Sequence, residues 1–391
     1  MINEEVKNLS NEYIANTYSR FDVAIESGNG VFCKDFDGKE YLDFTSGIGV
    51  NSLGFCDSKW AEAVIKQVRT LNHTSNLYYT LPGARLAAKL CLKSGMKKVF
   101  FSNSGAEANE CAIKAARKYS FDKYGSGRHE IITLENSFHG RTLATLSATG
   151  QDVFHKFFDP FVEGFVYTKA NDAQELLSKI SEKTCAIMLE VIQGEGGVLE
   201  LHSAFLDEIV DVAQKKDILI IVDEVQTGIG RCGTLFGYQG FQFLPNIVSC
   251  AKGLAGGLPL GATLFDEKTA AVLSAGSHAT TFGANPIICS AAEAVLDSLN
   301  QEALLDIMQK GIYMRVEIAK MPHVLSVNGQ GLMLGVALDV DNKSVVEKCL
   351  QAGLLVLTAK EKLRLLPPLN ITIEEIKSGL EILEKVLKNI E

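Results

Sequence analysis

Residues 218–224 have the sequence Ile-Leu-Ile-Ile-Val-Asp-Glu, a run of five apolar residues that ends in two acids. A continuous apolar run of this length is typical of a strand that is buried on both faces of a parallel sheet. The stretch Ala204–Lys215 before it has the apolar spacing of an amphipathic helix. A helix that leads directly into a buried strand is a building unit of α/β folds.

Other segments in the middle of the chain repeat this alternation. A second helical stretch, Glu107–Tyr119, follows a short apolar segment. The other predicted strands are Lys98–Phe101, Glu130–Leu134, Cys185–Leu189, Ile247–Ala251 and Leu260–Phe265. Strands separated by helices predict an α/β fold with a mostly parallel sheet that is covered on both faces. Ligands bind such sheets at the carboxyl ends of the strands, where most of the polar residues discussed below fall.

The character of the sequence changes after Asn285-Pro286. From residue 290 onward, two long helical stretches surround a strand-like segment, Gly331–Leu338, which predicts a separate C-terminal α+β domain. The hairpin-like segment GNGVFCKDFDGKEYLDF at 28–44 is expected to join that domain. We therefore predict an N-terminal segment at 1–60 that joins the small domain, a large domain at 61–285 and a small domain at 286–391.

The composition argues against several classes of function. Of the 391 residues, 47% are hydrophobic and 22% are charged, as in an ordinary globular enzyme. A formal net charge of −9 without a basic stripe argues against binding to nucleic acid or to an anionic membrane. No apolar run is long enough to span a bilayer, and the acidic N-terminus is unlike a secretory signal. The nine cysteines include no C-x-x-C pair, so we expect no zinc site and reduced thiols in the cytoplasm.

The segment Ser102–Glu107, SNSGAE, lies between a predicted strand and a predicted helix. Ser104 and Glu107 have the spacing of a capping box, so the segment could be an ordinary helix start. A helix N-terminus with small residues also exposes backbone N–H groups, which favour an anion such as a phosphate. Both interpretations remain open from the residues alone.

The acids that end the 218–224 segment have three interpretations. They could hold magnesium in a nucleotide hydrolase, but that requires a G-x-x-x-x-G-K-[ST] loop, and the chain has none. Asp223 could instead pair with a protonated heterocyclic nitrogen, as pyridoxal phosphate requires. The third interpretation is a structural acid at the end of a strand.

The stretch Gly228–Gly233 matches the G-x-G-x-x-G pattern of dinucleotide-binding enzymes. That pattern should open a helix and precede an acid, whereas the residues after it are not a helix start and the acids come before it. We interpret it as a flexible turn.

Two further segments carry groups with chemical potential. Lys252 ends a predicted strand and enters the loop Gly253-Leu-Ala-Gly-Gly257; a partly desolvated lysine there can lose its proton and act as a nucleophile. In Ser137–Thr142, SFHGRT, Phe138 could stack on a ring and Arg141 could bind a carboxylate. The ordinary alternatives are a surface lysine, a core phenylalanine and a surface arginine.

Seven segments in order resemble the class III aminotransferases, along nearly the whole chain. They are SNSGAEANE (102–110), SFHGRT (137–142), EVIQGEGG (190–197), IVDEVQTGIGR (221–231), AKGLAGG (251–257), TTFGANP (280–286) and RLLPPL (364–369). The resemblance implies the fold of type I pyridoxal-phosphate-dependent transferases, with a mostly parallel seven-stranded sheet in the large domain and a smaller α+β domain built from both chain ends.

The resemblance implies pyridoxal 5′-phosphate (PLP) as the cofactor. Lys252 would carry it as a Schiff base, and Asp223 would pair with its pyridine nitrogen. The other residues implied for the cofactor are Gln226 at the phenolic oxygen, Phe138 and Val225 on the two ring faces, Gly105 and Ala106 at the phosphate, and Thr281 of the partner subunit, which completes the phosphate site. Family members share active sites in this way and are at least homodimers. No metal is implied.

The resemblance also implies the substrates. Arg141, helped by Thr280, would hold the α-carboxylate of N2-acetylornithine, and Arg364 would hold that of 2-oxoglutarate. Glu195 would mask Arg364 while the terminal amine reacts. The implied reaction is transfer of the distal amino group to 2-oxoglutarate in arginine biosynthesis. Lys252, once freed by the substrate amine, is the natural general base, and the two half-reactions predict ping-pong kinetics.

Three segments depart from the usual family pattern. Val191 replaces a frequent proline, Thr280 replaces a usual serine, and the loop Asn51–Asp57 has an unusual ending. Other donors within the class are ornithine, succinylornithine, succinyl-diaminopimelate and 4-aminobutyrate. From other classes the alternatives are a PLP enzyme that does not transaminate, against which the Glu195–Arg364 pair argues, and a NAD-dependent dehydrogenase, against which the glycine context argues.

Overall fold

The centre of the protein is a seven-stranded sheet, seen in a computed structural model that describes residues 2–241 and 243–390. The strand order is β4-β12-β11-β10-β7-β5-β6. The bounds are β4 (Lys98–Ser102), β5 (Glu130–Leu134), β6 (Phe165–Thr168), β7 (Thr184–Leu189), β10 (Leu219–Asp223), β11 (Ile247–Cys250) and β12 (Gly261–Phe265). Strand β12 runs antiparallel to both of its neighbours, and the other pairings are parallel. The predicted mostly parallel sheet is therefore confirmed.

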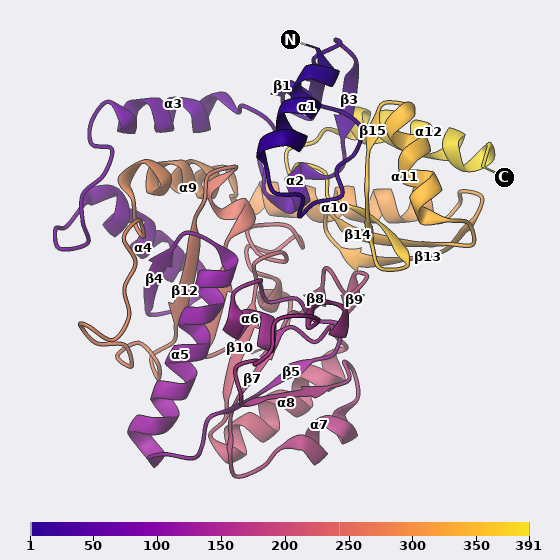
Figure 1. The fold of residues 1–391 in the computed structure, drawn as a ribbon. Coiled ribbons are helices and arrows are strands. Elements are labelled where there is room, and N and C mark those ends of the chain that lie inside the picture. The colour runs from indigo at the N-terminus through magenta and orange to yellow at the C-terminus, as the bar shows by residue number, and fades with distance from the viewer. Residues whose placement is uncertain (1, 242, 391) are drawn as a thin grey trace.

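Helices cover this sheet on both faces (Figure 1). Alternate side chains of β10 point to opposite sides, as the period of a strand requires. Ile220 and Val222 pack in the cluster that contains the apolar side chains of α8, whereas Leu219 and Ile221 pack in a second cluster with those of α5. An apolar run without alternation in the sequence is thus explained by burial on both faces.

The helices differ in length from one turn to more than five. They are α1 (Asn3–Tyr13), α2 (Ser46–Gly49), α3 (Ser58–Val68), α4 (Leu81–Ser94), α5 (Gly105–Tyr124), α6 (Leu143–Ala148), α7 (Ala173–Lys179), α8 (Ser203–Lys216), α9 (Pro286–Ser298), α10 (Gln301–Ile318), α11 (Asn342–Gln351) and α12 (Ile373–Lys388). Among residues 2–241 and 243–390, we find no helix long and apolar enough to cross a membrane.

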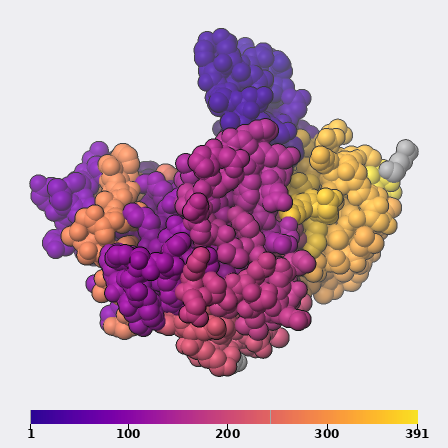
Figure 2. Space-filling model, turned by 60° about the horizontal axis from the view of Figure 1, so that its bottom comes forward, coloured from indigo at the N-terminus to yellow at the C-terminus, as the bar shows by residue number. Residues whose placement is uncertain are grey.

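Both chain ends contribute to a smaller region beside the large sheet. One sheet has the order β13-β14-β17-β16, with β13 (Val324–Gln330), β14 (Met333–Leu338), β16 (Leu357–Ala359) and β17 (Lys362–Leu365). A second sheet, β1-β2-β3-β15, joins β1 (Ile25–Asn29), β2 (Phe32–Asp35) and β3 (Glu40–Asp43) to β15 (Leu354–Leu355). A short hairpin, β8 (Ile192–Gln193) with β9 (Leu199–Glu200), lies between the regions. The N-terminal residues project as a lobe beside the C-terminal part (Figure 2).

The domain boundaries at 60/61 and 285/286 stay predictions. Helix α9, which follows the second boundary, packs against α3 and α4 on the side of the large sheet that is remote from the small sheets (Figure 1). Helices α10, α11 and α12 pack with the C-terminal strands instead. We therefore propose that the chain passes to the small domain after α9, near Leu299.

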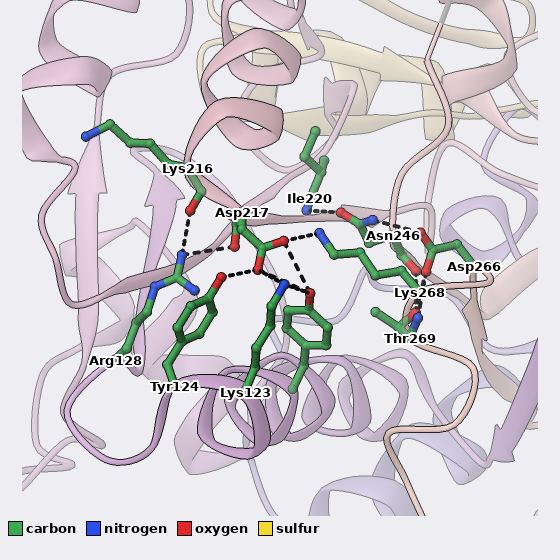
Figure 3. Close-up of polar contacts among 11 residues, drawn as sticks. Lys123, Tyr124, Arg128, Lys216, Asp217, Ile220, Asn246, Asp266, Lys268 and Thr269 are labelled. Atoms are coloured by element: carbon green, nitrogen blue, oxygen red, sulfur yellow. Dashed lines mark hydrogen bonds and ion pairs between the residues drawn. The ribbon is translucent and has the colours of Figure 1, made fainter.

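A polar cluster around Asp217 joins three segments at the end of the sheet where β10 begins (Figure 3). Asp217 ends α8 in the left-handed conformation, with φ of 52°. Its carboxylate accepts hydrogen bonds from Lys123 Nζ at 2.8 Å, from Lys268 Nζ at 2.5 Å and from the Tyr124 hydroxyl. Burial favours the protonated acid, but these three bonds hold the pKa of Asp217 well below its usual range. The cluster fixes the start of the strand whose far end carries Asp223.

Replacing Asp217 with asparagine should lower the free energy of unfolding at pH 7 by about 1–2 kcal/mol, which is the range for hydrogen bonds to charged groups reduced for the partial exposure of the cluster. Because the folded-state pKa is depressed, this stabilisation is present above an unfolded pKa of ~3.9 and is lost as the pH falls toward the folded value. Thermal melts of both proteins between pH 7 and pH 3 check this. Asp211→Asn, which removes an exposed pair with Lys215 on the same helix, is the control and should change stability by less than ~0.5 kcal/mol. A gap between wild type and Asp217→Asn that stays constant into acid would contradict the prediction.

Candidate active site

One cavity of about 470 Å³ lies at the carboxyl ends of the large sheet's parallel strands. It brings together residues from segments that are as much as 210 positions apart in the chain, between Val50 and Leu260. The residues predicted from the sequence that line it are Gly105, Ala106, Phe138, Arg141, Asp223, Val225, Gln226 and Lys252. The convergence follows from the parallel strands, whose carboxyl ends meet at one edge of the sheet.

The N-terminus of α5 forms one wall of the cavity. Ser104 is the N-cap residue, and its hydroxyl accepts a hydrogen bond from the Glu107 N–H at 3.2 Å. The Glu107 carboxylate reaches back to the Asn103 N–H at 2.6 Å, one residue beyond the position that a capping box requires. The amides of Gly105 and Ala106 lie in the first helical turn, where no carbonyl four residues earlier can accept from them. They are therefore available to an anion in the cavity.

Gly105 occupies a place that no larger residue could take. A Cβ atom built on it would lie 2.8 Å from Val225 Cγ1. The missing side chain lets the amides of α5 approach the loop that follows β10. Val225, which this close approach brings against α5, lines the cavity together with Phe138.

Asp223 ends β10 as a buried carboxylate held from several sides. Its Oδ2 accepts a hydrogen bond from Asn109 Nδ2 at 2.7 Å and lies 2.8 Å from His139 Nδ1. Its Oδ1 accepts from the Val225 N–H at 2.9 Å. An ionised carboxylate offers about four acceptor positions, so three neighbours leave room for one donor from the cavity. Asp223 is thus oriented to receive a protonated nitrogen.

Lys252 follows β11 and is only half-buried, because its side chain reaches the cavity. Its backbone is in the left-handed region, with φ of 43°, which is unusual for a residue with a Cβ and is typical of functional sites. Burial lowers the pKa of Lys252; Glu195 opposes this shift, and the Arg364 charge adds to it. A lowered pKa increases the share of neutral amine, which is the nucleophilic form.

Arg141 lies exposed at the mouth of the cavity. Its guanidinium carbon is 4.0 Å from the centroid of the Phe154 ring and 5.6 Å from that of the Phe138 ring. Within the described residues 2–241 and 243–390, no carboxylate lies in ion-pair range of Arg141. The stacked guanidinium is therefore fixed in place and free to bind a carboxylate from solution.

Arg364 behaves differently, because it is buried and already paired. Its Nη1 donates to Glu195 Oε1 at 2.6 Å and to Gln226 Oε1 at 3.0 Å. Gln226 Nε2 also donates to Glu195 Oε1, at 3.2 Å. Burial alone would raise the pKa of the Glu195 carboxyl, but the Arg364 charge holds this pKa below its usual range. The pair is therefore ionised at neutral pH. Gln226 lines the cavity, and the pair lies directly behind it.

Thr280 and Thr281 are not brought into the cavity of their own chain. The Thr280 hydroxyl accepts a hydrogen bond from Asn103 Nδ2 at 3.1 Å, and Asn103 lines the cavity. Thr281 is exposed and is not among the residues that line it. Their predicted roles in binding stay predictions.

Three polar residues around the site were not predicted as parts of it. Asn109 and His139 hold Asp223, as described above. Glu190 is buried in the cavity wall, where its carboxylate accepts from the Phe138 N–H at 2.9 Å and the Gly194 N–H at 3.1 Å. Burial raises the pKa of Glu190 to about 7. Its place just after β7 is the signal that could have found it, since Asp223 lies at the same carboxyl edge of the sheet, at the end of β10.

Two of the unusual family positions have a clear structural setting. Val191 is buried, and a Cβ atom on Gly237 would lie 2.7 Å from its Cγ2, so the position is one of packing. In the loop 51–57, the Ser52 hydroxyl donates to the Gly253 carbonyl at 2.9 Å. Asp57 accepts from the Trp60 N–H and caps α3. The loop therefore supports the turn that carries Lys252.

Comparisons with known proteins agree with this geometry. A family model described as "Aminotransferase class-III" matches residues 13–387. The acetylornithine aminotransferase of Haemophilus ducreyi is 54% identical over 393 aligned residues, which cover 100% of both chains. The solved acetylornithine aminotransferase of Elizabethkingia anophelis superposes with a TM-score of 0.88 at 30% identity, over 100% of both chains.

A further solved structure of similar fold is described as containing a cofactor. It is the Toxoplasma gondii ornithine aminotransferase, described as having partial occupancy of PLP at its active site; its TM-score is 0.93 at 28% identity, with 98% of this chain and 94% of that chain covered. The family model matches nearly all of the described chain. This chain is therefore a member of the class III aminotransferases.

Proposed function

We propose that this chain transfers the distal amino group of N2-acetylornithine to 2-oxoglutarate, giving N-acetylglutamate 5-semialdehyde and glutamate, as in arginine biosynthesis. The observation that carries the proposal is a pair of different arginines around one lysine-bearing cavity. Arg141 is open at the mouth, whereas Arg364 is buried and covered by Glu195. Two substrates that present their carboxylates at different places need such a pair. The proposal is also supported by two of the relatives named above, which are described as acetylornithine aminotransferases.

PLP is the cofactor of this family, and the residues of the cavity fit it. Lys252 Nζ is available for covalent attachment, the Asp223 carboxylate can receive a protonated ring nitrogen, and the amides at the start of α5 can receive a phosphate. Phe138 and Val225 are available to the two ring faces. When bound, PLP withdraws electrons from the carbon whose C–H bond breaks.

The proposed roles of the protein groups follow from their positions. Asp223, held by Asn109 and His139, keeps a proton on the ring nitrogen through a charge-assisted hydrogen bond. Lys252 Nζ, whose pKa is lowered by burial, takes the proton from the amine-bearing carbon of the donor.

The two arginines are proposed to act in turn. Arg141 binds the α-carboxylate of the donor at the cavity mouth, which leaves the distal amine directed toward Lys252. Glu195 meanwhile keeps Arg364 neutralised. When 2-oxoglutarate enters, Glu195 leaves Arg364, which then binds the keto acid's α-carboxylate.

We also propose a homodimer that shares its active sites, in the cytoplasm. Exposed apolar side chains gather on the segment after α3, which is tied to the segment 280–283 by hydrogen bonds from Asn76 to the Thr280 and Gly283 carbonyls. They are Leu71, Leu77, Tyr78, Tyr79, Leu81 and Phe282. A second copy on this surface would cover them and bring Thr281 toward its partner's cavity. The cytoplasmic location is supported by nine cysteines that are all unpaired thiols.

A panel of amino donors with 2-oxoglutarate as acceptor tests the proposed substrate. N2-acetylornithine should have the highest kcat/KM, by ~10-fold or more over ornithine and 4-aminobutyrate, because one acyl or methylene difference is worth about 1–3 kcal/mol in a pocket. Succinylornithine is the closest competitor and should follow. Equal or higher kcat/KM for ornithine or 4-aminobutyrate would contradict the proposed substrate while leaving the aminotransferase chemistry intact.

A further inference from the structure

The glycine-rich turn Gly228–Gly233 is filled by protein and offers no room for a dinucleotide. A Cβ atom on Gly230 would lie 3.2 Å from Leu369, and one on Gly233 would lie 3.1 Å from Met308 of α10. Both glycines have φ values in the left-handed region, 85° and 88°. The turn predicted to be flexible is instead buried, and residues of the small domain pack against it.

Arg231, in the middle of this turn, is a buried cation without an acidic partner. Its side chain is 2% exposed, and no ion pair to it exists within the described residues 2–241 and 243–390. The Asp43 carboxylate is near enough to affect the pKa of Arg231, but it accepts hydrogen bonds from the Thr45 N–H and the Ser46 N–H instead. Burying an unpaired charge costs free energy, so the hydrogen bonds of the Arg231 guanidinium have to offset that cost.

Arg231 holds the ends of two strands together. Its Nη1 donates to the Leu332 carbonyl at 2.9 Å and to the Pro367 carbonyl at 2.5 Å. Its own carbonyl accepts from the Leu332 N–H at 2.9 Å. Leu332 directly precedes β14, and Pro367 lies just past the end of β17, which pairs with β14 in antiparallel register.

These two carbonyls belong to residues two positions beyond the last pair of the same ladder. Leu334 pairs with Leu365, so the register places Leu332 opposite Pro367. Proline has no N–H and cannot donate to a strand partner. The Arg231 guanidinium supplies the missing donor and binds both carbonyl oxygens, so it closes the ladder where the chain cannot.

The strand end that Arg231 closes is the one that carries Arg364. Arg364 lies three residues before Pro367, on β17, and its Nη1 contacts Gln226 Oε1. Gln226 lies on the same loop as Arg231, after Asp223. One short loop of the large domain therefore contacts both the Arg364 side chain and the backbone that positions it.

We propose that Arg231 is a positioning residue for the keto-acid clamp: by closing the β14–β17 ladder, it sets the place of the Arg364 guanidinium without touching cofactor or substrate. This inference rests on the proposed function, in which Arg364 binds the carboxylate of 2-oxoglutarate. It assigns the glycine-rich turn the role of a rigid joint between the cofactor site and the acceptor site.

The test compares Arg231→Met and Arg231→Lys with wild type in both half-reactions. In a ping-pong enzyme, kcat/KM for each substrate reports on its own half-reaction. Arg231→Met should lower kcat/KM for 2-oxoglutarate ~10-fold or more, mainly through KM, because a clamp displaced by ~1 Å can cost that much. The value for N2-acetylornithine should change less than ~3-fold. Arg231→Lys, which can reach one carbonyl, should be intermediate.

Binding without turnover gives a second readout. Glutarate, a dicarboxylate that lacks the reacting carbonyl, should bind the Arg231→Met enzyme ~10-fold more weakly, as expected for a misplaced charge pair. N-acetylnorvaline, which resembles the donor without its distal amine, should bind both proteins equally. Lys310→Met is the matched control: Lys310, on α10, is also a buried cation, but it pairs with Asp306 on its own helix. It should lower the melting temperature without changing glutarate binding.

The outcomes separate this inference from the proposed function. Unchanged glutarate binding in a folded Arg231→Met or Arg231→Lys protein overturns the inference, as does an equal loss in both half-reactions. If Arg231→Met does not fold, Arg231→Lys decides by the same criteria. Failure of the proposed function shows instead in the wild-type enzyme alone, as a donor panel that does not favour N2-acetylornithine.

Discussion

Lys252→Ala should abolish turnover and leave the fold and the non-covalent binding of PLP in place. Among the described residues that line the cavity, Lys252 is the only lysine, so in this variant the donor's C–H proton has no base. A fall of at least ~10³-fold in kcat lies within the range of general-base catalysis. Asp223 and the amides at the start of α5 remain to hold the cofactor. Alanine meets the same backbone constraint as lysine at a φ of 43°, so no new strain arises.

Borohydride reduction and peptide mapping measure the attachment directly. In the wild-type protein the cofactor should be fixed on Lys252, and the Lys252→Ala protein should release it on gel filtration in denaturant. Lys215→Ala, an exposed lysine on α8, is the control and should behave as wild type. Recovery of the label on another lysine, or residual activity close to wild type in Lys252→Ala, would refute the assignment.

The sequence predicts the large sheet well where burial leaves a simple pattern. The apolar run 218–222 is found as β10 within one residue, because both of its faces are covered. Strand β6, Phe165–Thr168, was not predicted, because it lies at the sheet edge and its side chains are mostly half-buried. Its four residues, Phe-Val-Tyr-Thr, favour a strand by propensity, but the segment is too short to show a continuous apolar run or a clear alternation.

The site is predictable where chemistry and a strand end coincide, as for Asp223 and Lys252. Residues that act through tertiary contacts leave no such trace. Asn109 lies inside α5 and is an ordinary polar helix residue until the fold brings Asp223 to it. Arg231 lies in a glycine pattern that points to phosphates, and its partner Leu332 comes from a strand pair about a hundred residues later. Such roles require the packed structure.

Arg364→Ala should separate the two half-reactions, which is the sharpest consequence of the two-arginine site. Acceptor turnover should fall by ~10²-fold or more, because truncating one partner of a buried charge pair costs about 2–5 kcal/mol. The donor half-reaction should fall less than ~10-fold, since the donor's carboxylate is proposed to lie on Arg141. Single-turnover absorbance changes of the cofactor measure each half-reaction separately.

Two further variants distinguish a gate from a structural ion pair. Glu195→Ala leaves Arg364 uncovered throughout, so ordinary α-amino donors such as glutamate should improve relative to N2-acetylornithine. The Arg364 charge holds the pKa of Glu195 below its usual range, so the wild-type cover is ionised at neutral pH and a charge is lost in this variant. Arg141→Ala should hurt N2-acetylornithine selectively, because the exposed guanidinium is the donor's proposed clamp. An Arg364→Ala enzyme that is equally slow in both half-reactions would mean that Arg364 and Glu195 only brace Gln226, and the gate would then be rejected.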